Sequence, residues 1–173
     1  NAEIYDTTMG WRFVNPKMQH LYGIDEMGAT AENVAADYKI SREDQDQMAL
    51  RSQNKAEIAQ ANGSLAEEIL TVEIPQRKSD NKVFDKDEHV RPGSTIEALK
   101  KLRPSFQEGG SVTAGNSSGI NDGSCALIIA SEKAASEHGL TPKARILGLA
   151  AGGVPPRVMG IGPVPATRKL MSR

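Results

Sequence analysis

The feature that most constrains the fold is a pair of short apolar runs in the last third of the chain. Residues 126–130 (Ala-Leu-Ile-Ile-Ala) are continuously apolar, which is typical of a β-strand covered on both faces. A second, largely apolar run spans residues 144–149, and a helix expected from Ser131 to about Gly139 separates the two. This order predicts a right-handed crossover between parallel strands. Because the rest of the chain offers no obvious cover for both faces, we expect these strands to belong to a larger, layered α/β sheet.

The sequence before residue 110 is polar and mostly helical in pattern. Its clearest helix begins after Ser41, an N-cap candidate followed by two acidic residues, and ends before Gly63. Residues 69–74 alternate apolar and polar side chains, which predicts a half-buried strand, and residues 76–90 are expected to form an exposed excursion. Three further helices are predicted here: one after Asn15-Pro16, one capped by Thr30 and ending at Tyr38, and one from Ser94 or Thr95 to Leu102.

Composition narrows the range of partners and compartments. The formal net charge is -1, and no apolar run approaches the roughly 20 residues that cross a bilayer, so we expect neither nucleic acid nor a membrane as a partner. The single cysteine, Cys125, excludes an intramolecular disulfide framework and favours a reducing, cytoplasmic compartment. The polar opening residues show no signal-peptide pattern. Residues 141–173 hold six basic and no acidic side chains, which either attract a phosphorylated cofactor or pack against further chain.

Cys125 and the three histidines are the residues that most often act as nucleophiles or metal ligands. A reactive cysteine typically lies at a helix N-terminus or beside a cation, whereas Cys125 leads into the expected strand at residues 126–130, so we expect a buried structural cysteine. His20, His89 and His138 show no metal-ligand spacing, and no metal site is predicted. His89 has charged neighbours in sequence, but such neighbours rarely face the same point, which favours a solvated surface.

Two glycine-rich loops are the best candidates for a ligand site. Residues 113–123 contain three glycines, two asparagines and two serines directly before the expected strand. Glycine permits positive φ and close backbone approach, and Ser or Asn can bind a ligand, although a plain tight turn fits equally well. Residues 159–166 precede a helix expected from Pro165 or Ala166, whose N-terminus suits an anionic or carbonyl oxygen; a rigid connector is the alternative. Neither loop has a phosphate-loop pattern.

Five segments in this order closely resemble thiolases, and together they cover essentially the whole chain. They are residues 27–35 (Met-Gly-Ala-Thr-Ala-Glu-Asn-Val-Ala), 40–46 (Ile-Ser-Arg-Glu-Asp-Gln-Asp), 87–91 (Asp-Glu-His-Val-Arg), the loop 112–123, and residues 158–166. The opening residues 6–16 (Asp-Thr-Thr-Met-Gly-Trp-Arg-Phe-Val-Asn-Pro) are most similar to the 3-oxoadipyl-CoA (β-ketoadipyl-CoA) thiolases, acyltransferases of aromatic-compound breakdown.

The resemblance implies an α/β, thiolase-like fold, with a mostly helical loop domain that covers coenzyme A and a partial strand-helix-strand unit of the layered core. On this map residues 1–110 match the loop domain, 111–138 match the end of the N-terminal half, and 139–173 match the start of the C-terminal half. Thiolases are longer than this chain, which the resemblance identifies as a central fragment.

The resemblance also implies which chemical groups the chain lacks. Thiolases use an acyl-accepting cysteine, a histidine in a Gly-His-Pro motif, a second cysteine and an Asn-Glu-Ala-Phe segment. None of these motifs occurs in the 173 residues, and Cys125 matches neither family cysteine. We expect the nucleophile upstream of residue 1 and the other groups downstream of Arg173. No catalytic residue is therefore predicted, and we expect this chain alone to be inactive.

What the resemblance carries over is contact with coenzyme A, which is a substrate and not a covalently bound cofactor. Arg91 matches a basic position beside the adenosine end, where a guanidinium can stack on adenine and still face a phosphate. Ser118 matches a serine on the pantetheine arm, and Ala114 and Gly119 line the same loop. The remaining candidates for contact with coenzyme A are Phe106, Met159 and Gln53.

For the acyl group, one further residue is a candidate. A 3-oxoadipyl chain ends in a free carboxylate, which needs a cationic partner when it is desolvated. Arg12 lies between Trp11 and Phe13 in the segment most similar to the 3-oxoadipyl-CoA thiolases, so it is the candidate partner. A surface arginine is the alternative interpretation.

Three interpretations of function stay open. The resemblance implies an acyltransferase that cleaves 3-oxoadipyl-CoA with CoA to succinyl-CoA and acetyl-CoA, and a homotetramer for the full-length enzyme. The alternatives are a stand-alone module that binds CoA or a partner, and a non-catalytic thiolase-like protein. For the chain alone, exposed strand edges at residues 126–130 and 144–149 predict self-association.

Overall fold

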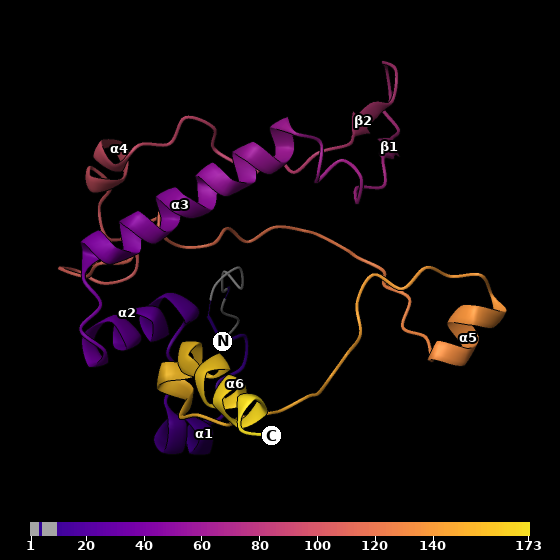
Figure 1. Ribbon diagram of the computed structural model, residues 1–173. Coiled ribbons are helices and arrows are strands. Elements are labelled where there is room, and N and C mark those ends of the chain that lie inside the picture. The colour runs from indigo at the N-terminus through magenta and orange to yellow at the C-terminus, as the bar shows by residue number, and fades with distance from the viewer. Residues whose placement is uncertain (1–3, 5–9) are drawn as a thin grey trace. The chain divides into compact units, whose positions relative to one another are not determined.

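The computed structural model describes residue 4 and residues 10–173, and these form two compact units (Figure 1). The first unit contains Asp25–Gly119 and, before them, the described residues as far as Arg12. The second contains Phe13–Ile24 and Ile120–Arg173. No helix in the described part of the chain is long and apolar enough to cross a membrane.

Two helices, α2 (Met27–Asp37) and α3 (Arg42–Ala61), open the main part of the first unit. The α3 helix is confirmed as predicted, because the Ser41 side chain accepts the backbone N–H of Asp44 and the chain leaves the helix before Gly63, whose φ is 82°. The predicted start of α2 was wrong by one turn. Thr30 does not cap this helix; its hydroxyl donates to the Met27 carbonyl at 2.8 Å from inside it, a bond that Thr can make within a helix.

A β-hairpin follows α3. Strands β1 (Val72–Ile74) and β2 (Lys82–Phe84) pair antiparallel, with Val72 opposite Phe84 and Ile74 opposite Lys82. The predicted strand at residues 69–74 is therefore present but shorter, and its predicted half-burial is wrong, because all three strand residues are exposed. The excursion expected at residues 76–90 is exposed as predicted, and it also supplies the second strand, which its charged sequence did not indicate.

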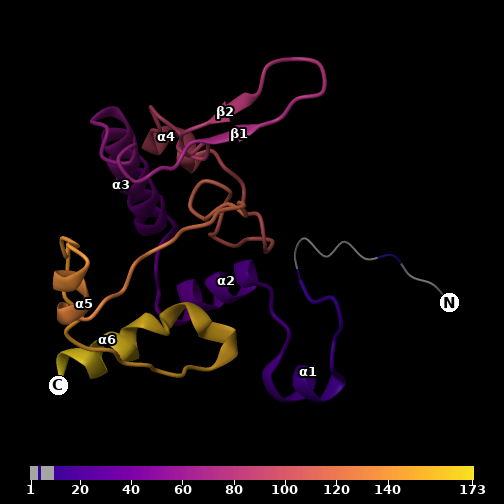
Figure 2. The same ribbon diagram turned by 90° about the vertical axis from the view of Figure 1, so that its right-hand side faces the viewer.

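Helix α4 (Ile96–Lys100) lies alongside α3 in both views (Figures 1 and 2). Thr95 caps it by accepting the backbone N–H of Ala98 at 3.2 Å, so the predicted start is confirmed. The core of this unit is small and includes Ala35, Leu99 and Val112. Two polar side chains, Asp46 and Thr113, are completely buried beside these apolar ones, which places a polar network inside the unit.

The second unit contains α1 (Pro16–Tyr22), α5 (Glu132–Glu137), the 3-10 helix η1 (Pro156–Ile161) and α6 (Pro163–Met171). Asn15 accepts backbone N–H groups at the start of α1, and Ser131 does so at the start of α5, so both predicted helix starts are confirmed. The helix that was expected from Pro165 or Ala166 begins slightly earlier, at Pro163.

The two strands expected in the second unit do not form. Residues 126–130 and 144–149 are extended but unpaired, and their side chains are exposed; Ile128 is 82% exposed and Leu147 91%. A β-strand is stabilised by hydrogen bonds to a neighbouring strand, and among the described residues neither run has one. Only the helix of the expected strand-helix-strand unit is therefore present. The domain boundaries after residues 110 and 138 stay predictions.

Candidate functional site

The glycine-rich loop that begins at Ser111 is tied to α2 by one carboxylate. Glu32 is 7% exposed, and its carboxylate accepts the backbone N–H of Ser111 at 2.9 Å and that of Val112 at 2.8 Å. The Ser111 hydroxyl donates to the same carboxylate at 3.1 Å and accepts the Gln45 side-chain amide at 2.9 Å. Hydrogen bonds to a charged acceptor are stronger than those to a neutral one, so Glu32 fixes where the loop starts.

Asn116 then holds the loop in shape from within. Its side-chain carbonyl accepts the backbone N–H of Thr113 at 2.7 Å, while its amide donates to the Ser111 carbonyl at 3.1 Å. The Ser117 hydroxyl donates to the Thr113 carbonyl at 2.7 Å and closes the turn. These bonds are made within the protein alone, so the loop is already ordered before any ligand contacts it.

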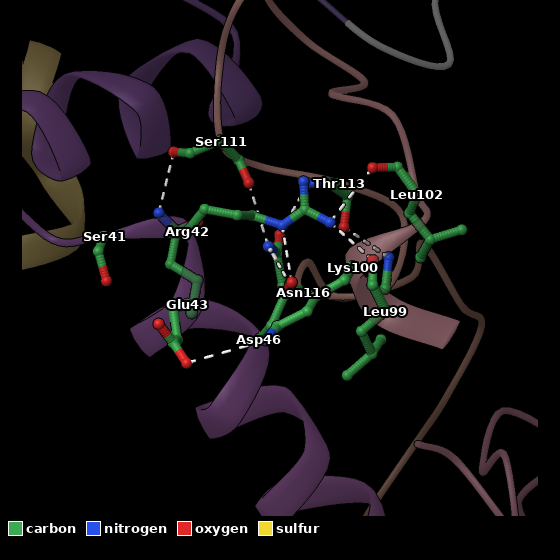
Figure 3. A network of polar contacts seen from close by, with 12 residues as sticks. Ser41, Arg42, Glu43, Asp46, Leu99, Lys100, Leu102, Ser111, Thr113 and Asn116 are labelled. Atoms are coloured by element: carbon green, nitrogen blue, oxygen red, sulfur yellow. Dashed lines mark hydrogen bonds and ion pairs between the residues drawn. The ribbon is translucent and has the colours of Figure 1, made fainter. Parts of the chain in front are cut away.

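A partly buried ion pair connects this loop to two helices (Figure 3). Asp46 accepts the Arg42 Nε–H at 2.8 Å and the Asn116 side-chain amide at 3.0 Å, and its side chain is fully buried. The Arg42 guanidinium also donates to the Leu99 carbonyl at 2.7 Å and the Leu102 carbonyl at 3.2 Å, at the end of α4. Removing Arg42 would leave the Asp46 charge buried, and breaking a buried pair in this way typically costs about 3–5 kcal/mol.

Two glycines permit the close contacts in this region. A Cβ at Gly110 would overlap the Glu32 carboxylate, and a Cβ at Gly115 would meet the side chains of Leu99 and Leu102. Glycine therefore permits close packing at both positions: Gly110 packs against Glu32 of α2, and Gly115 packs against Leu99 of α4. The sequence indicated two uses of glycine in this region, positive φ and close backbone approach, and these contacts are of the second kind.

Three of the predicted coenzyme A contacts lie on this loop. Ala114, Ser118 and Gly119 are all exposed, whereas Thr113 in the same loop is completely buried. Within the described residues no buried side-chain nitrogen or oxygen lacks a partner. The loop therefore uses one set of residues for its own structure and leaves the predicted contact residues accessible.

A second segment, residues 87–93, is held by the C-terminal half of α3. Gln53 accepts the backbone N–H of Arg91 at 2.9 Å, and Glu57 accepts that of Gly93 at 3.2 Å. The Gln60 side-chain amide donates to the Asp87 carbonyl at 2.9 Å. The structure thus brings together two predicted site residues, Gln53 and Arg91.

The Arg91 side chain is exposed, and its guanidinium donates to the Glu88 carbonyl at 3.2 Å. No carboxylate in the described part of the chain pairs with it. Glu88 pairs instead with Lys82 at 3.4 Å. The Arg91 guanidinium is consequently accessible to an anionic or aromatic ligand.

The other predicted site residues lie elsewhere. Phe106 is half-buried and packs so closely on Gly28 of α2 that a Cβ there would overlap its ring. Met159 lies in η1 of the second unit and is 49% exposed. Arg12 is exposed, and residues 6–9 of the segment around it lie outside the described residues.

Cys125 does not match its prediction. It was expected to be a buried cysteine that leads into a core strand, but it is free and exposed, and the described residues form no strand at 126–130. The described residues contain no group of three or more His, Cys, Asp or Glu side chains that could hold a metal ion. His20, His89 and His138 are all exposed.

Sequence reasoning missed Glu32, Arg42, Asp46, Asn116 and Glu57 as contributors to the site. One usable signal was spacing, because Gln53, Glu57 and Gln60 recur at helical intervals and so share a face of α3. Glu32 and Asp46 carried no such signal. An acidic residue in a helix is usually exposed, and their partners lie in a distant segment.

Comparison with known proteins assigns the class of protein. Residues 6–133 match the family model described as "Thiolase, N-terminal domain". The chain belongs to the thiolase family.

Two relatives show which kinds of thiolase the chain is similar to. The chain is 58% identical over 173 residues to a beta-ketoadipyl-CoA thiolase of Pseudomonas putida, covering 100% of this chain and 43% of that protein. It is 55% identical over 172 residues to the 3-oxoadipyl-CoA/3-oxo-5,6-dehydrosuberyl-CoA thiolase of Escherichia coli strain K12, covering 99% of this chain and 43% of that one. The chain thus spans less than half the length of these relatives.

A solved structure supports the fold class. The acetyl-CoA acetyltransferase of Bacillus anthracis superposes with a TM-score of 0.81 at 43% sequence identity, covering 96% of this chain and 44% of that one. The predicted thiolase-like α/β fold class is confirmed, although the described structure forms no strand at residues 126–130 or 144–149.

Proposed function

We propose that this chain supplies a coenzyme A-contacting surface of a thiolase that cleaves 3-oxoadipyl-CoA with CoA, giving succinyl-CoA and acetyl-CoA. The observation that carries the proposal is the 58% identity to a beta-ketoadipyl-CoA thiolase across all 173 residues. In this reaction the C2–C3 bond of the 3-oxoacyl chain breaks, C3 forms a thioester with the sulfur of free CoA, and C2 gains a proton.

The residues of this chain bind and orient the CoA arm in this proposal. Ser118, Ala114 and Gly119 offer an accessible loop surface to pantetheine, and the loop is held by Glu32 and Asn116 before the ligand arrives. Preorganisation of this kind reduces the entropy lost on binding. Arg91 offers an exposed guanidinium to the adenosine end. Phe106 and Met159 are the proposed apolar contacts along the arm and near the acyl end.

The reacting groups are not among these residues. The 173 residues hold no Gly-His-Pro or Asn-Glu-Ala-Phe segment, and Cys125 is exposed in an extended stretch. We therefore propose that the chain by itself does not catalyse thiolysis. Turnover of 3-oxoadipyl-CoA and CoA by the purified chain, above the rate with heat-inactivated chain, would contradict this.

The substrate proposal is tested in a grafted enzyme, in which these 173 residues replace the matching stretch of the Pseudomonas putida relative. We expect this enzyme to cleave 3-oxoadipyl-CoA with a kcat/KM at least tenfold above that for acetoacetyl-CoA. An equal or reversed preference would reject 3-oxoadipyl-CoA as the substrate. We also propose a cytoplasmic, homotetrameric enzyme that needs neither nucleic acid nor a membrane, and sedimentation of the grafted enzyme tests the tetramer.

One observation favours a second candidate, a module that binds CoA by itself. The loop from Ser111 to Gly119 is ordered by contacts that lie wholly within this chain. Calorimetry with CoA and the 173-residue chain separates the two candidates. A micromolar Kd favours the module, and no measurable binding favours a surface that needs the remaining walls of a thiolase cleft.

A further inference from the structure

Helix α3 contacts both of the segments that carry the proposed coenzyme A contacts. Its first two turns hold the loop after Ser111 through Gln45 and Asp46. Its last turns hold residues 87–93 through Gln53 and Glu57. These are different ends of one continuous 20-residue helix.

The helix therefore fixes the spacing between the two segments. Asp46 and Gln53 are seven positions apart, and at 1.5 Å per residue the rise between them is about 10 Å along the axis. The corresponding rise from Asp46 to Glu57 is about 16 Å. Residues spaced along a continuous helix cannot change this separation without breaking backbone hydrogen bonds.

Asp46 and Gln53 already use their acceptor oxygens for hydrogen bonds within the protein. Asp46 is completely buried, and both of its oxygens are used, one by Arg42 and one by Asn116. The side-chain carbonyl of Gln53, a predicted coenzyme A contact, already accepts the backbone N–H of Arg91. Through these engaged oxygens, Asp46 and Gln53 act on a ligand by way of the segment that each one holds.

We propose that α3 positions coenzyme A at two points: Asp46, through Asn116, orders the loop that meets the pantetheine arm, and Gln53 with Glu57 orders the turn that presents Arg91 to the adenosine end. This inference rests on the proposed function. It makes Gln53 a positioning residue, not a direct contact.

The proposal predicts two separable effects, because pantetheine is the CoA arm without its nucleotide. A change at Gln53 disturbs only the Arg91 turn, so it weakens the use of CoA and leaves the use of pantetheine unchanged. A change at Asp46 disturbs the pantetheine loop, so it weakens the use of both thiols. If Gln53 and Asp46 served only general stability, changing either residue would weaken the use of both thiols alike.

The experiment measures thiolysis of 3-oxoadipyl-CoA by the grafted enzyme, with CoA or pantetheine as the attacking thiol. For Gln53→Ala we expect a KM for CoA at least fivefold higher, with kcat and the KM for pantetheine within twofold of the unsubstituted enzyme. For Gln53→Glu, which keeps an acceptor for the Arg91 N–H, we expect most of the loss to be restored. Gln47→Ala, at an exposed position on the same helix, is the matched control and should change neither KM.

For Asp46→Asn we expect about tenfold higher KM values for both thiols. Asn116→Ala is a second variant at the same junction, used because it leaves the Arg42–Asp46 pair in place, and it should give the same pattern. Melting temperatures of all variants separate loss of folding from loss of thiol binding.

Two outcomes would overturn the inference. One is a Gln53→Ala enzyme whose KM values for CoA and pantetheine rise together; the other is an Asp46→Asn or Asn116→Ala enzyme that melts earlier but keeps both KM values. Failure of the proposed function looks different, because the unsubstituted grafted enzyme would then fail to use 3-oxoadipyl-CoA. If the unsubstituted grafted enzyme uses CoA with saturation kinetics but no variant separates the KM for CoA from that for pantetheine, only the positioning role is rejected.

Discussion

The Glu32 carboxylate, on the second turn of α2, accepts the backbone N–H of Val112 at 2.8 Å. Glu32 is nearly buried, and the same carboxylate accepts two bonds from Ser111. A single acidic side chain thus satisfies three donors at the start of the loop that presents Ser118. A carboxylate is suited to this task because it only accepts hydrogen bonds, through two oxygens.

Replacing Glu32 with glutamine is expected to destabilise the chain by roughly 1.5–3 kcal/mol, because bonds to a charged acceptor are lost and the amide brings donors where donors already converge. Urea denaturation followed by circular dichroism measures the change in the free energy of unfolding. Glu68→Gln, at an exposed position, is the control and should change it by less than about 0.5 kcal/mol. A Glu32→Gln chain as stable as the control would contradict a role for this carboxylate in holding the loop.

Gly28→Ala is expected to destabilise the chain even though alanine favours a helix. The added methyl group would overlap the Phe106 ring, and such overpacking typically costs about 1–3 kcal/mol, more than the gain in helix propensity of about 1 kcal/mol. Denaturant unfolding should show the loss, and adding Phe106→Leu should recover at least half of it. Gly123→Ala, where nothing lies within 4 Å of the new methyl, is the control. Equal stabilities for the Gly28→Ala chain and the original chain would mean that the Phe106 ring moves aside and accommodates the added methyl group.

Cys125 is expected to react fully with a water-soluble disulfide reagent in the native 173-residue chain, because its side chain is exposed. Absorbance of the released thiolate gives the rate, and the same measurement in denaturant gives the reference for a fully accessible thiol. The two rates should agree within about tenfold, since exposure is one of the two factors that set thiol reactivity. Protection that disappears only on unfolding would indicate that residues 126–130 pair with another strand in solution.

Arg12→Met is expected to discriminate between substrates in the grafted enzyme. If Arg12 pairs with the terminal carboxylate of 3-oxoadipyl-CoA, its loss should lower kcat/KM for that substrate by at least tenfold, and change it by less than threefold for acetoacetyl-CoA, which has no such carboxylate. Arg51→Met, exposed on α3, is the matched control. Equal losses with both substrates would identify Arg12 as a structural surface residue.

The elements that could be predicted from sequence are those with local causes. Ser41, Thr95 and Ser131 each cap the helix that follows them, and the signal lies within four residues of sequence. Residues 126–130 have the pattern of a covered strand, but a sequence pattern indicates only which structure a segment is suited to form. Whether a strand forms depends on a neighbouring strand, and the described residues do not provide one.

The exposed residues of the candidate site could be proposed from the sequence, whereas the residues that support them could not. Ser118 and Arg91 could be proposed from family resemblance and are accessible, as contact residues need to be. Asp46 looks like a solvated helix residue in sequence, because its burial depends on Asn116, which lies 70 positions away. Such pairings depend on tertiary structure, and no local propensity indicates them.

The distance along the chain between the partners of this network also has a kinetic consequence. The Glu32–Val112 bond joins residues 80 positions apart, and the Asp46–Asn116 bond closes a loop of 70. Helix α3 needs only local contacts, and helices of its length relax in about 0.1–1 μs. The long loops cost more chain entropy to close and gain stabilisation only once closed. We therefore expect the proposed coenzyme A surface to be the last part of its unit to mature during folding, after the helix that supports it.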